Sequence, residues 1–147
     1  MLNKLAVLIS TLCGAGFLTK APGTVGSVIA ALISAFINVN IYAILLIIIL
    51  GVWASCRAEQ ILGSSYAKEH DPGCIVIDEA VGVWLAVLFL PKTFIIPALV
   101  LFRIIDILKP WPVYLFERLP SGWGIMADDI AGGIIVNLLL QLFIIYY

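Results

Sequence analysis

Residues 127–147 read ADDIAGGIIVNLLLQLFIIYY, an acidic pair followed by an almost uninterrupted apolar run. A helix that crosses the hydrocarbon core of a bilayer needs about 20 residues, and this stretch is long enough. Four further apolar stretches lie between helix-breaking residues, at 24–37, 41–61, 75–90 and 93–108. We therefore predict an all-α fold, a polytopic membrane helical bundle of about five apolar helices plus an N-terminal helix or re-entrant segment.

Three of these stretches are short for a membrane span. The stretches 24–37, 75–90 and 93–108 each fall below the lower limit of about 17 residues for a spanning helix. We expect their ends to lie near the headgroup boundary, or the bilayer to thin around them.

The composition agrees with one integral-membrane domain over residues 1–147. Of these residues 63% are hydrophobic and 12% are charged, whereas soluble domains average about 45–50% and about 25%. A soluble fold of this length could not bury so much apolar surface, and disorder requires the opposite composition. The net charge of −1 provides no basic surface, so we expect no nucleic-acid partner. The three cysteines form no Cys-x-x-Cys motif, which disfavours a disulfide framework or a thiolate metal cluster.

The first residues look like a short signal peptide, because Lys4 precedes an apolar run. The small-residue pattern that a signal peptidase requires is poor in this segment. We therefore expect a retained N-terminal helix or a re-entrant segment.

Charged residues gather at one end of the predicted bundle. The connections 37–40 and 90–92, together with the C-terminal stretch, contain one charged side chain, Lys92. Because basic residues concentrate on the cytoplasmic side of membrane proteins, we expect the other, highly charged end to be cytoplasmic. The connections at that end carry these charged residues: Lys20, Arg57, Glu59, Lys68, Glu69, Asp71, Asp78, Glu79, Arg103, Asp106, Lys109, Glu117, Arg118, Asp128 and Asp129.

Acidic residues at the edge of the hydrocarbon core cost free energy, so they are expected to pair with a cation or to serve a function. Helix N-termini favour negative charge, whereas helix C-termini disfavour it. Asp106 lies near a predicted C-terminus and needs a cation, which Arg103, Lys109 or a bound metal ion could supply. Three acidic clusters lie at the charged ends of the predicted helices, the first and third near N-termini: Asp78 with Glu79, Asp106 alone, and Asp128 with Asp129.

The ligand types available in these clusters indicate a hard metal ion. Carboxylate oxygens select Mg²⁺ or Mn²⁺ over softer metals. The chain has a single histidine, His70, which excludes a three-histidine zinc site. We expect His70 and Asp71 to form a loop pair with a structural or solvated role.

At helical spacing, the acids fall in line with small and polar residues, so that several predicted helices each carry a stripe of such residues along one face. Packing between helices explains the small residues, and we expect the stripes to face the bundle interior. Packing does not explain why an acid lies at the charged end of these stripes. Glu59 occupies the same position on a further stripe. Two stripes are Asp129, Gly133, Asn137 and Gln141, and Asp78, Gly82 and Ala86.

Residues 21–27 read APGTVGS and form a glycine-rich helix start directly after Lys20. Thr24 or Ser27 can cap the helix, and the glycines let backbone amides approach an anion. Most such starts only cap a helix. This one faces the same end as the acids and the basic residues, which favours a phosphate together with a divalent cation.

The stretch 111–124 mixes aromatic residues with prolines and charged residues, and we do not expect it to span the membrane. Such a mixture suits a segment that lies at the membrane interface. An ordinary loop with aromatic anchors is an equally good interpretation.

Four sequence blocks together resemble one known family. They are APGTVGS at 21–27, HDPGCIVIDEAVG at 70–82, FRIIDILKPWP at 102–112 and GIMADDIAG at 124–132. No single block is specific, but the four occur in order and extend from about Gly14 to Gly133, and together they resemble the phosphatidylglycerophosphatase A family. The one departure is Ile105, where an aromatic residue is expected, and it affects packing only.

The resemblance implies a bacterial inner-membrane, multi-pass, Mg²⁺-dependent lipid phosphatase with its active site at the cytoplasmic face. Such an enzyme hydrolyses phosphatidylglycerophosphate to phosphatidylglycerol and inorganic phosphate, the last step of phosphatidylglycerol synthesis in phospholipid biosynthesis. The partner is then a membrane lipid substrate, and a homo-oligomer is compatible with this interpretation.

The resulting hypothesis assigns roles to eight residues. The metal ligands for one or two Mg²⁺ or Mn²⁺ ions are Asp78, Glu79, Asp106 and Asp129. The catalytic residues are Asp78, Asp106, Asp129 and Lys109. The substrate-binding residues are Lys20, Thr24, Arg103 and Lys109. The nucleophile is either a metal-activated water or an aspartate that forms an aspartyl-phosphate, and the sequence leaves both open.

The alternative function is a small membrane transporter or proton-coupled channel that uses the carboxylates as an ion relay. It predicts polar residues across the whole membrane, and beyond the acids the stretch 127–147 offers only Asn137 and Gln141. A histidine-type lipid phosphatase needs a second histidine and is excluded. A CDP-alcohol phosphotransferase is excluded because its long aspartate-rich signature is missing.

Overall fold

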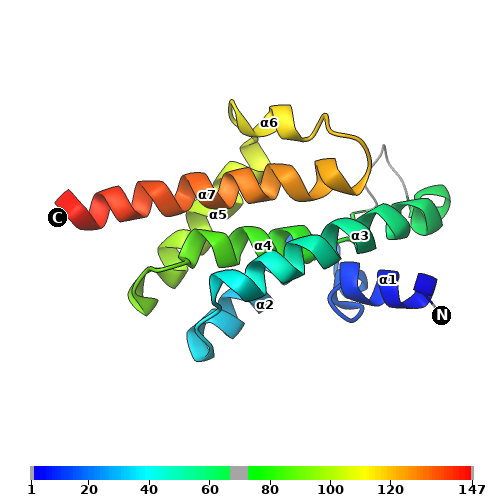
Figure 1. Ribbon diagram of the computed structural model, residues 1–147, viewed down its shortest axis with the longest axis horizontal. Coiled ribbons are helices and arrows are strands. Elements are labelled where there is room, and N and C mark those ends of the chain that lie inside the picture. Colours follow the sequence, from blue (N-terminus) through cyan, green and yellow to red (C-terminus); the bar gives the residue numbers. More distant parts are fainter. Residues whose placement is uncertain (1, 67–72, 147) are drawn as a thin grey trace.

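The computed structural model describes residues 2–66 and 73–146, and these residues fold as an all-α bundle without strands (Figure 1). The all-α fold class is thereby confirmed. His70 and Asp71, together with Lys68 and Glu69, lie outside the described residues. The helices are α1 (Leu2–Ser10), η1 (Ala15–Phe17), α2 (Pro22–Phe36), α3 (Ile41–Tyr66), α4 (Ile77–Val87), η2 (Lys92–Phe94), α5 (Ile95–Leu108), α6 (Val113–Phe116) and α7 (Gly122–Tyr146).

Helix α4 is the core of the bundle. It contacts α2, α3, α5 and α7, and nearly all of its side chains are buried. A helix that is apolar on every side is expected to be surrounded on every side. Other helices of the same chain surround α4. With 11 residues at 1.5 Å per residue, it is only about 16 Å long.

Among residues 2–66 and 73–146, two helices are long and apolar enough to cross a membrane. They are Ile41–Leu62 within α3, with a mean hydropathy of 2.1, and α7, with a mean hydropathy of 1.9. The prediction of about five spans is therefore not confirmed. The apolar run at 75–90 contains a helix that protein rather than lipid can cover, and an apolar run by itself does not distinguish the two environments.

Many large apolar side chains lie on the surface of α2, α3 and α7. Soluble monomers rarely expose contiguous apolar areas of more than a few hundred Å². The exposed side chains and the two long apolar helices are consistent with a membrane-associated protein. On these helices the exposed residues include Val28, Leu32, Phe36, Tyr42, Leu45, Leu46, Ile49, Leu138, Leu139, Leu142, Phe143 and Ile145.

Helices α4 and α7 pack closely along the two predicted stripes. A Cβ atom added at Gly133 would overlap the carbonyl oxygen of Gly82, and one added at Gly82 would overlap the ring of Phe102. Further along, Asn137 Nδ2 donates to the carbonyl oxygens of Ala86 and Leu88 at 3.1 and 2.8 Å. The prediction that both stripes face the interior is confirmed, and their contact fixes the register between the acidic ends of α4 and α7.

The N-terminal segment forms the predicted helix, α1, which packs against α3 with Ala6 and Ser10 buried. The Ser10 carbonyl oxygen accepts a hydrogen bond of 2.8 Å from the N–H of Val76, immediately before α4. In Figure 1, the N-terminus lies at one end of the long axis, and the C-terminus, the α2–α3 turn and the α4–α5 turn lie toward the other. This alternation brings the start of α4 and the start of α7 to the same end of the bundle.

Candidate active site

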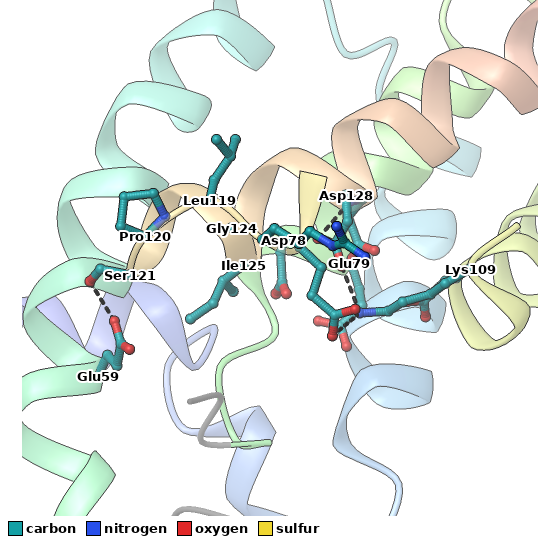
Figure 2. A pocket seen from close by; sticks show the side chains of 14 residues that line it. Glu59, Asp78, Glu79, Lys109, Leu119, Pro120, Ser121, Gly124, Ile125 and Asp128 are labelled. Carbon is teal, nitrogen blue, oxygen red and sulfur yellow. Dashed lines mark hydrogen bonds and ion pairs between the residues drawn. The ribbon is translucent and has the colours of Figure 1, made fainter. Parts of the chain in front are cut away.

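A cavity of about 620 Å³ opens where the charged helix ends meet (Figure 2). This volume lies within the usual range of ligand pockets, about 300–1,000 Å³. The cavity draws residues from α3, the first turn of α4, the end of α5, the α6–α7 connection and the first turns of α7. The lining residues are Glu59, Asp78, Glu79, Asp106, Lys109, Glu117, Arg118, Leu119, Pro120, Ser121, Gly124, Ile125, Asp128 and Asp129.

Three carboxylates meet in this cavity. Asp78, Glu79 and Asp129 each provide an oxygen within 4.8 Å of the others. Asp78 and Asp129 are buried, and Glu79 is partly buried. Glu79 Oε2 and Asp129 Oδ2 are buried and accept no hydrogen bond from the residues that the structure describes. Crowded buried carboxylates repel one another and lack solvation, so the cluster favours binding of a cation.

The donor set of this cluster fits a hard divalent ion. Each of the three residues offers an oxygen, and Mg²⁺ and Mn²⁺ prefer oxygen ligands. Asp78 and Glu79 lie in the first turn of α4, as predicted, where the helix dipole favours negative charge.

Asp106, the fourth predicted metal ligand, lies beside the cluster. Its Oδ2 forms an ion pair with Nη1 of Arg103, one of the two cations that the sequence offered as its partner. The negative charge of Asp106 nevertheless acts on both Glu79 and Asp129. The cluster therefore consists of three carboxylates at its centre and one that already shares a cation.

Lys109 provides a positive charge on the cavity wall. It terminates α5 in a left-handed conformation, with φ 42°, and its Nζ lies 2.7 Å from Asp128 Oδ2 and 3.0 Å from Glu117 Oε1. Burial by itself lowers the pKa of Lys109, but the hydrogen bonds and charges of Asp128 and Glu117 outweigh it and raise the pKa above its usual range. Lys109 is therefore a permanently protonated group at neutral pH.

The consecutive residues Asp128 and Asp129 have different partners. Asp128 Oδ2 pairs with Lys109, and its Oδ1 accepts the N–H of Asp129 at 3.0 Å. Asp129 joins the carboxylate cluster instead. Successive helical residues point in different directions, so two adjacent acids can serve two sites. The sequence indicated an acidic pair here but not that Asp128 is the partner of Lys109.

Asp128 and Asp129 lie toward the N-terminal end of α7, as predicted, but beyond its first turn, because the helix begins earlier than the predicted start at about residue 127. Helix α7 begins at Gly122 and has no acidic residue in its first turn. The helix dipole acts mainly within that turn, so it does not account for the stability of these two acids.

The glycine-rich start of α2 contacts the site differently from the prediction. The helix begins at Pro22 with Ala21 as its cap and no side-chain cap hydrogen bond, so the prediction of capping by Thr24 or Ser27 is wrong. Ser27 Oγ donates to the Gly23 carbonyl oxygen at 2.8 Å instead. Thr24 is exposed, and neither it nor the exposed Lys20 lines the cavity.

Gly23 is the residue of this block that touches the site. A Cβ atom at Gly23 would overlap Glu79 Oε1 and would lie 3.1 Å from Arg103 Nη1. The start of α2 therefore packs directly behind the carboxylate cluster, and the missing side chain leaves room for the Glu79 carboxylate.

Besides Asp128, four polar or charged residues that line the cavity were not among the predicted site residues, namely Glu59, Glu117, Arg118 and Ser121. Ser121 Oγ donates to Glu59 Oε2, and in Figure 2 this pair lies apart from Lys109 and the acids, with Ile125 between them. Arg118 stacks over the Tyr114 ring, with Cζ 5.3 Å from the centroid. Glu59 could have been found from its position on a stripe. Glu117, Arg118 and Ser121 lie in a connection that has no helical period.

The fold and the site define a helical, membrane-associated protein whose cavity combines clustered carboxylates with a protonated lysine, a combination suited to phosphate-ester chemistry. The family model of phosphatidylglycerophosphatase A matches residues 8–144. The chain belongs to the phosphatidylglycerophosphatase A family, as the sequence blocks indicated, and it is a phosphatase.

Curated relatives agree with this membership. The Escherichia coli K12 phosphatidylglycerophosphatase A is 34% identical over 131 residues, covering 83% of this chain and 73% of the relative. The Haemophilus influenzae phosphatidylglycerophosphatase A is 36% identical over 131 residues, covering 82% and 77%. A Bacteroides thetaiotaomicron protein with the provisional name phosphatidylinositol-3-phosphatase is 35% identical over 145 residues, covering 88% and 87%. No solved structure matches the chain.

Proposed function

We propose that this chain is a Mg²⁺-dependent lipid phosphatase that hydrolyses phosphatidylglycerophosphate to phosphatidylglycerol and inorganic phosphate. Mn²⁺ is the alternative ion, and the reaction would be the last step of phosphatidylglycerol synthesis. The observation that carries the proposal is one cavity with three clustered carboxylates and the protonated Lys109. Relatives named phosphatidylglycerophosphatase A support the choice of substrate.

Asp78, Glu79 and Asp129 would hold the metal ion, with Asp106 as a nearby fourth carboxylate. When bound, a divalent ion neutralises phosphate charge and increases the acidity of water. The cluster itself keeps negative charge concentrated at one position, so that a phosphate approaches only when this charge is compensated.

Lys109 would bind phosphate oxygens from the cavity wall, whereas Arg103 does not line the cavity and would act on the site through its ion pair with Asp106. Both side chains are already held by carboxylates, Lys109 by Asp128 and Glu117 and Arg103 by Asp106. This pairing holds each cation in place before substrate arrives, and pre-positioned charges lower the barrier for reactions in which charge develops.

Hydrolysis requires an oxygen nucleophile to attack phosphorus while the bond from phosphorus to the glycerol oxygen breaks and that oxygen takes up a proton. The nucleophile is either water, which gives inorganic phosphate directly, or an aspartate of the cluster, whose aspartyl-phosphate is then hydrolysed by water to release phosphate. Trapping with borohydride during turnover separates the two routes, because only an aspartyl-phosphate is reduced at the aspartate.

The cavity would lie at the cytoplasmic face of a multi-pass protein in the bacterial inner membrane. Arg57, Arg103, Lys109 and Arg118 lie at the cavity end of the bundle, whereas Lys92 lies at the opposite end. This distribution follows the preference of basic residues for the cytoplasmic side. Helices shorter than a full span would require local thinning of the bilayer or cover by other helices.

The experiment measures phosphate release from phosphatidylglycerophosphate by purified protein in detergent. We expect turnover with Mg²⁺, loss of turnover with EDTA, and recovery when Mg²⁺ is added in excess. Phosphatidic acid and phosphatidylinositol 3-phosphate serve as comparison substrates, since one relative carries a phosphoinositide name. Equal turnover after complete chelation would refute the metal assignment.

The alternative of a transporter with an ion relay receives no specific support. Asn137 donates to two carbonyl oxygens of the α4 end, and Gln141 Nε2 donates to Asn137 Oδ1 at 2.6 Å. These polar groups close the end of a helix, which accounts for their presence without a pathway for ions.

A further inference from the structure

The proposed substrate carries two phosphate groups, a terminal monoester that is removed and a diester that links the headgroup to the diacylglycerol. The carboxylate cluster and Lys109 account for the monoester. The diester carries a second negative charge a few bonds from the monoester. Unless a second cation lies at the cavity, this charge has no group to pair with.

Arg118 is the cavity cation that remains available for this group. It lines the cavity at an exposed position, and within residues 2–66 and 73–146 no ion pair includes it. By contrast, Lys109 and Arg103 are each bound to carboxylates. In the part of the chain that the structure describes, the Arg118 guanidinium lies over the Tyr114 ring and forms no hydrogen bond to a side chain.

The contact with Tyr114 leaves Arg118 suited to a phosphate. Its Cζ lies over the ring at 5.3 Å from the centroid, a cation–π contact that uses none of the guanidinium N–H donors. A guanidinium can donate two parallel hydrogen bonds to a phosphate diester. Tyr114 thereby holds the side chain in position without neutralising its charge.

The surroundings of Arg118 place it on the side from which a lipid would arrive. Leu115, Phe116 and Leu119 flank it along the chain and expose apolar side chains, and Trp123 is exposed at the start of α7. Aromatic and apolar residues mixed with charge are typical of segments at the membrane interface. A diester adjoining the acyl chains would therefore meet this segment first.

We propose that Arg118 binds the phosphodiester of the lipid headgroup and so selects lipids that carry a diester next to the scissile monoester. Arg118 is a specificity-determining residue at the cavity rim, not a group that acts on the reacting phosphorus. This inference rests on the proposed function, because it takes the two-phosphate lipid as the substrate.

The test compares Arg118→Gln with wild-type protein in detergent micelles of fixed lipid fraction. The probes are phosphatidylglycerophosphate as substrate, phosphatidylglycerol as an inhibitor with only the diester, and inorganic phosphate as an inhibitor without it. We expect the KM for the substrate and the inhibition constant of phosphatidylglycerol each to rise about tenfold, the effect of one lost charge-assisted hydrogen-bonded contact at an exposed site. The kcat and the inhibition constant of inorganic phosphate should stay within about twofold, because such binding is uniform between ground and transition states.

Two further variants separate binding from structure. Arg118→Lys keeps the charge and should recover part of the phosphatidylglycerol inhibition. Arg57→Gln removes one positive charge from an exposed α3 position that does not line the cavity, and it should match wild type throughout.

Two outcomes would overturn the assignment. One is an unchanged phosphatidylglycerol inhibition constant in Arg118→Gln, and the other is an equal loss of phosphatidylglycerol and inorganic phosphate binding, which indicates a disturbed cavity. A wild-type protein that releases no phosphate from phosphatidylglycerophosphate would instead refute the proposed function, so the two failures are distinguishable.

Discussion

At one end of the α4–α7 pair, Asn137 donates hydrogen bonds to the carbonyl oxygens of Ala86 and Leu88. At the other end of the same pair, buried oxygens of Glu79 and Asp129 accept no hydrogen bond from the described residues. The two ends share one register, because Gly133 and Gly82 hold the helices in contact between them. Polar groups at the first end complete the fold, whereas we propose that a ligand satisfies those at the second end.

The largest effect is expected for Asp129→Asn, which removes a carboxylate from the end of the α4–α7 pair where buried oxygens lack hydrogen bonds. We expect turnover to fall at least about a hundredfold, since even residues behind metal ligands cost tenfold to a hundredfold when changed. The melting temperature in EDTA should stay equal or rise, because one of three crowded buried charges is removed.

A thermal shift on adding Mg²⁺ provides a readout besides activity. Wild-type protein should melt at a higher temperature with Mg²⁺, and Asp129→Asn should show little shift. A variant that keeps near-normal turnover would contradict the assignment of Asp129.

The next effect is expected for Gly133→Ala, which disturbs the contact between the two ends. The added methyl group would meet the backbone of Gly82, which cannot rotate away. Overpacking of this kind costs about 1–3 kcal/mol, so both the melting temperature and the turnover should fall. Gly132→Ala makes the same change in helix propensity at the next residue, where an added Cβ would lie 3.3 Å from the Ile105 side chain rather than against backbone, and it is the matched control. If Gly133→Ala melts like wild type, the close approach of α4 and α7 is not required.

A smaller effect is expected for Gly23→Ala. The new methyl group would displace the flexible end of Glu79 rather than backbone, so stability should change little. Turnover should fall about tenfold, because a displaced carboxylate misplaces a catalytic group by a fraction of an ångström or more. The measurement is kcat with Mg²⁺ alongside the melting curve, and unchanged kcat would show that the Glu79 position is not critical.

The smallest effect on turnover is expected for Asn137→Leu. This change leaves two carbonyl oxygens without their donor, so the free energy of unfolding should drop by about 1–3 kcal/mol. The kcat of the folded fraction should equal that of wild type at a temperature well below melting. A selective loss of kcat would revive the interpretation of Asn137 as part of a polar pathway.

Local features of the site could be predicted from the sequence. The helical period placed Asp78, Gly82 and Ala86 on one face and Asp129, Gly133 and Asn137 on another, and the structure brings the two faces together. The charge on Asp106 near a helix end predicted a nearby cation, and Arg103 one turn earlier provides it. Both inferences use positions within one helix, where the sequence separation of two residues determines whether their side chains are neighbours.

Contacts between distant segments could not be predicted in this way. Lys109 bonds Asp128 and Glu117 rather than Asp106, and Ser121 reaches Glu59 on α3. Nothing in the local pattern distinguishes these partners, since they depend on how α5, α6 and α7 pack. The start of α7 was also missed, because Gly122 and Gly124 disfavour a helix and tertiary packing overrides that propensity.

The predicted number of membrane spans is not confirmed, for a related reason. Apolar character reports that a segment avoids water, and α4 avoids it among the other helices of the bundle. The short length of the run at 75–90, which the sequence already shows, fits a helix in the core of the bundle as well as a short span.

At the end of α5, conformational stability is reduced in exchange for a charged side chain at the cavity. A left-handed residue after a helix is most often glycine, since any other residue is strained there by about 1 kcal/mol. This position holds Lys109, whose long side chain reaches Asp128 and Glu117. A chain selected for heat resistance alone would place glycine at this position, and it would then lack the ammonium group of the cavity wall.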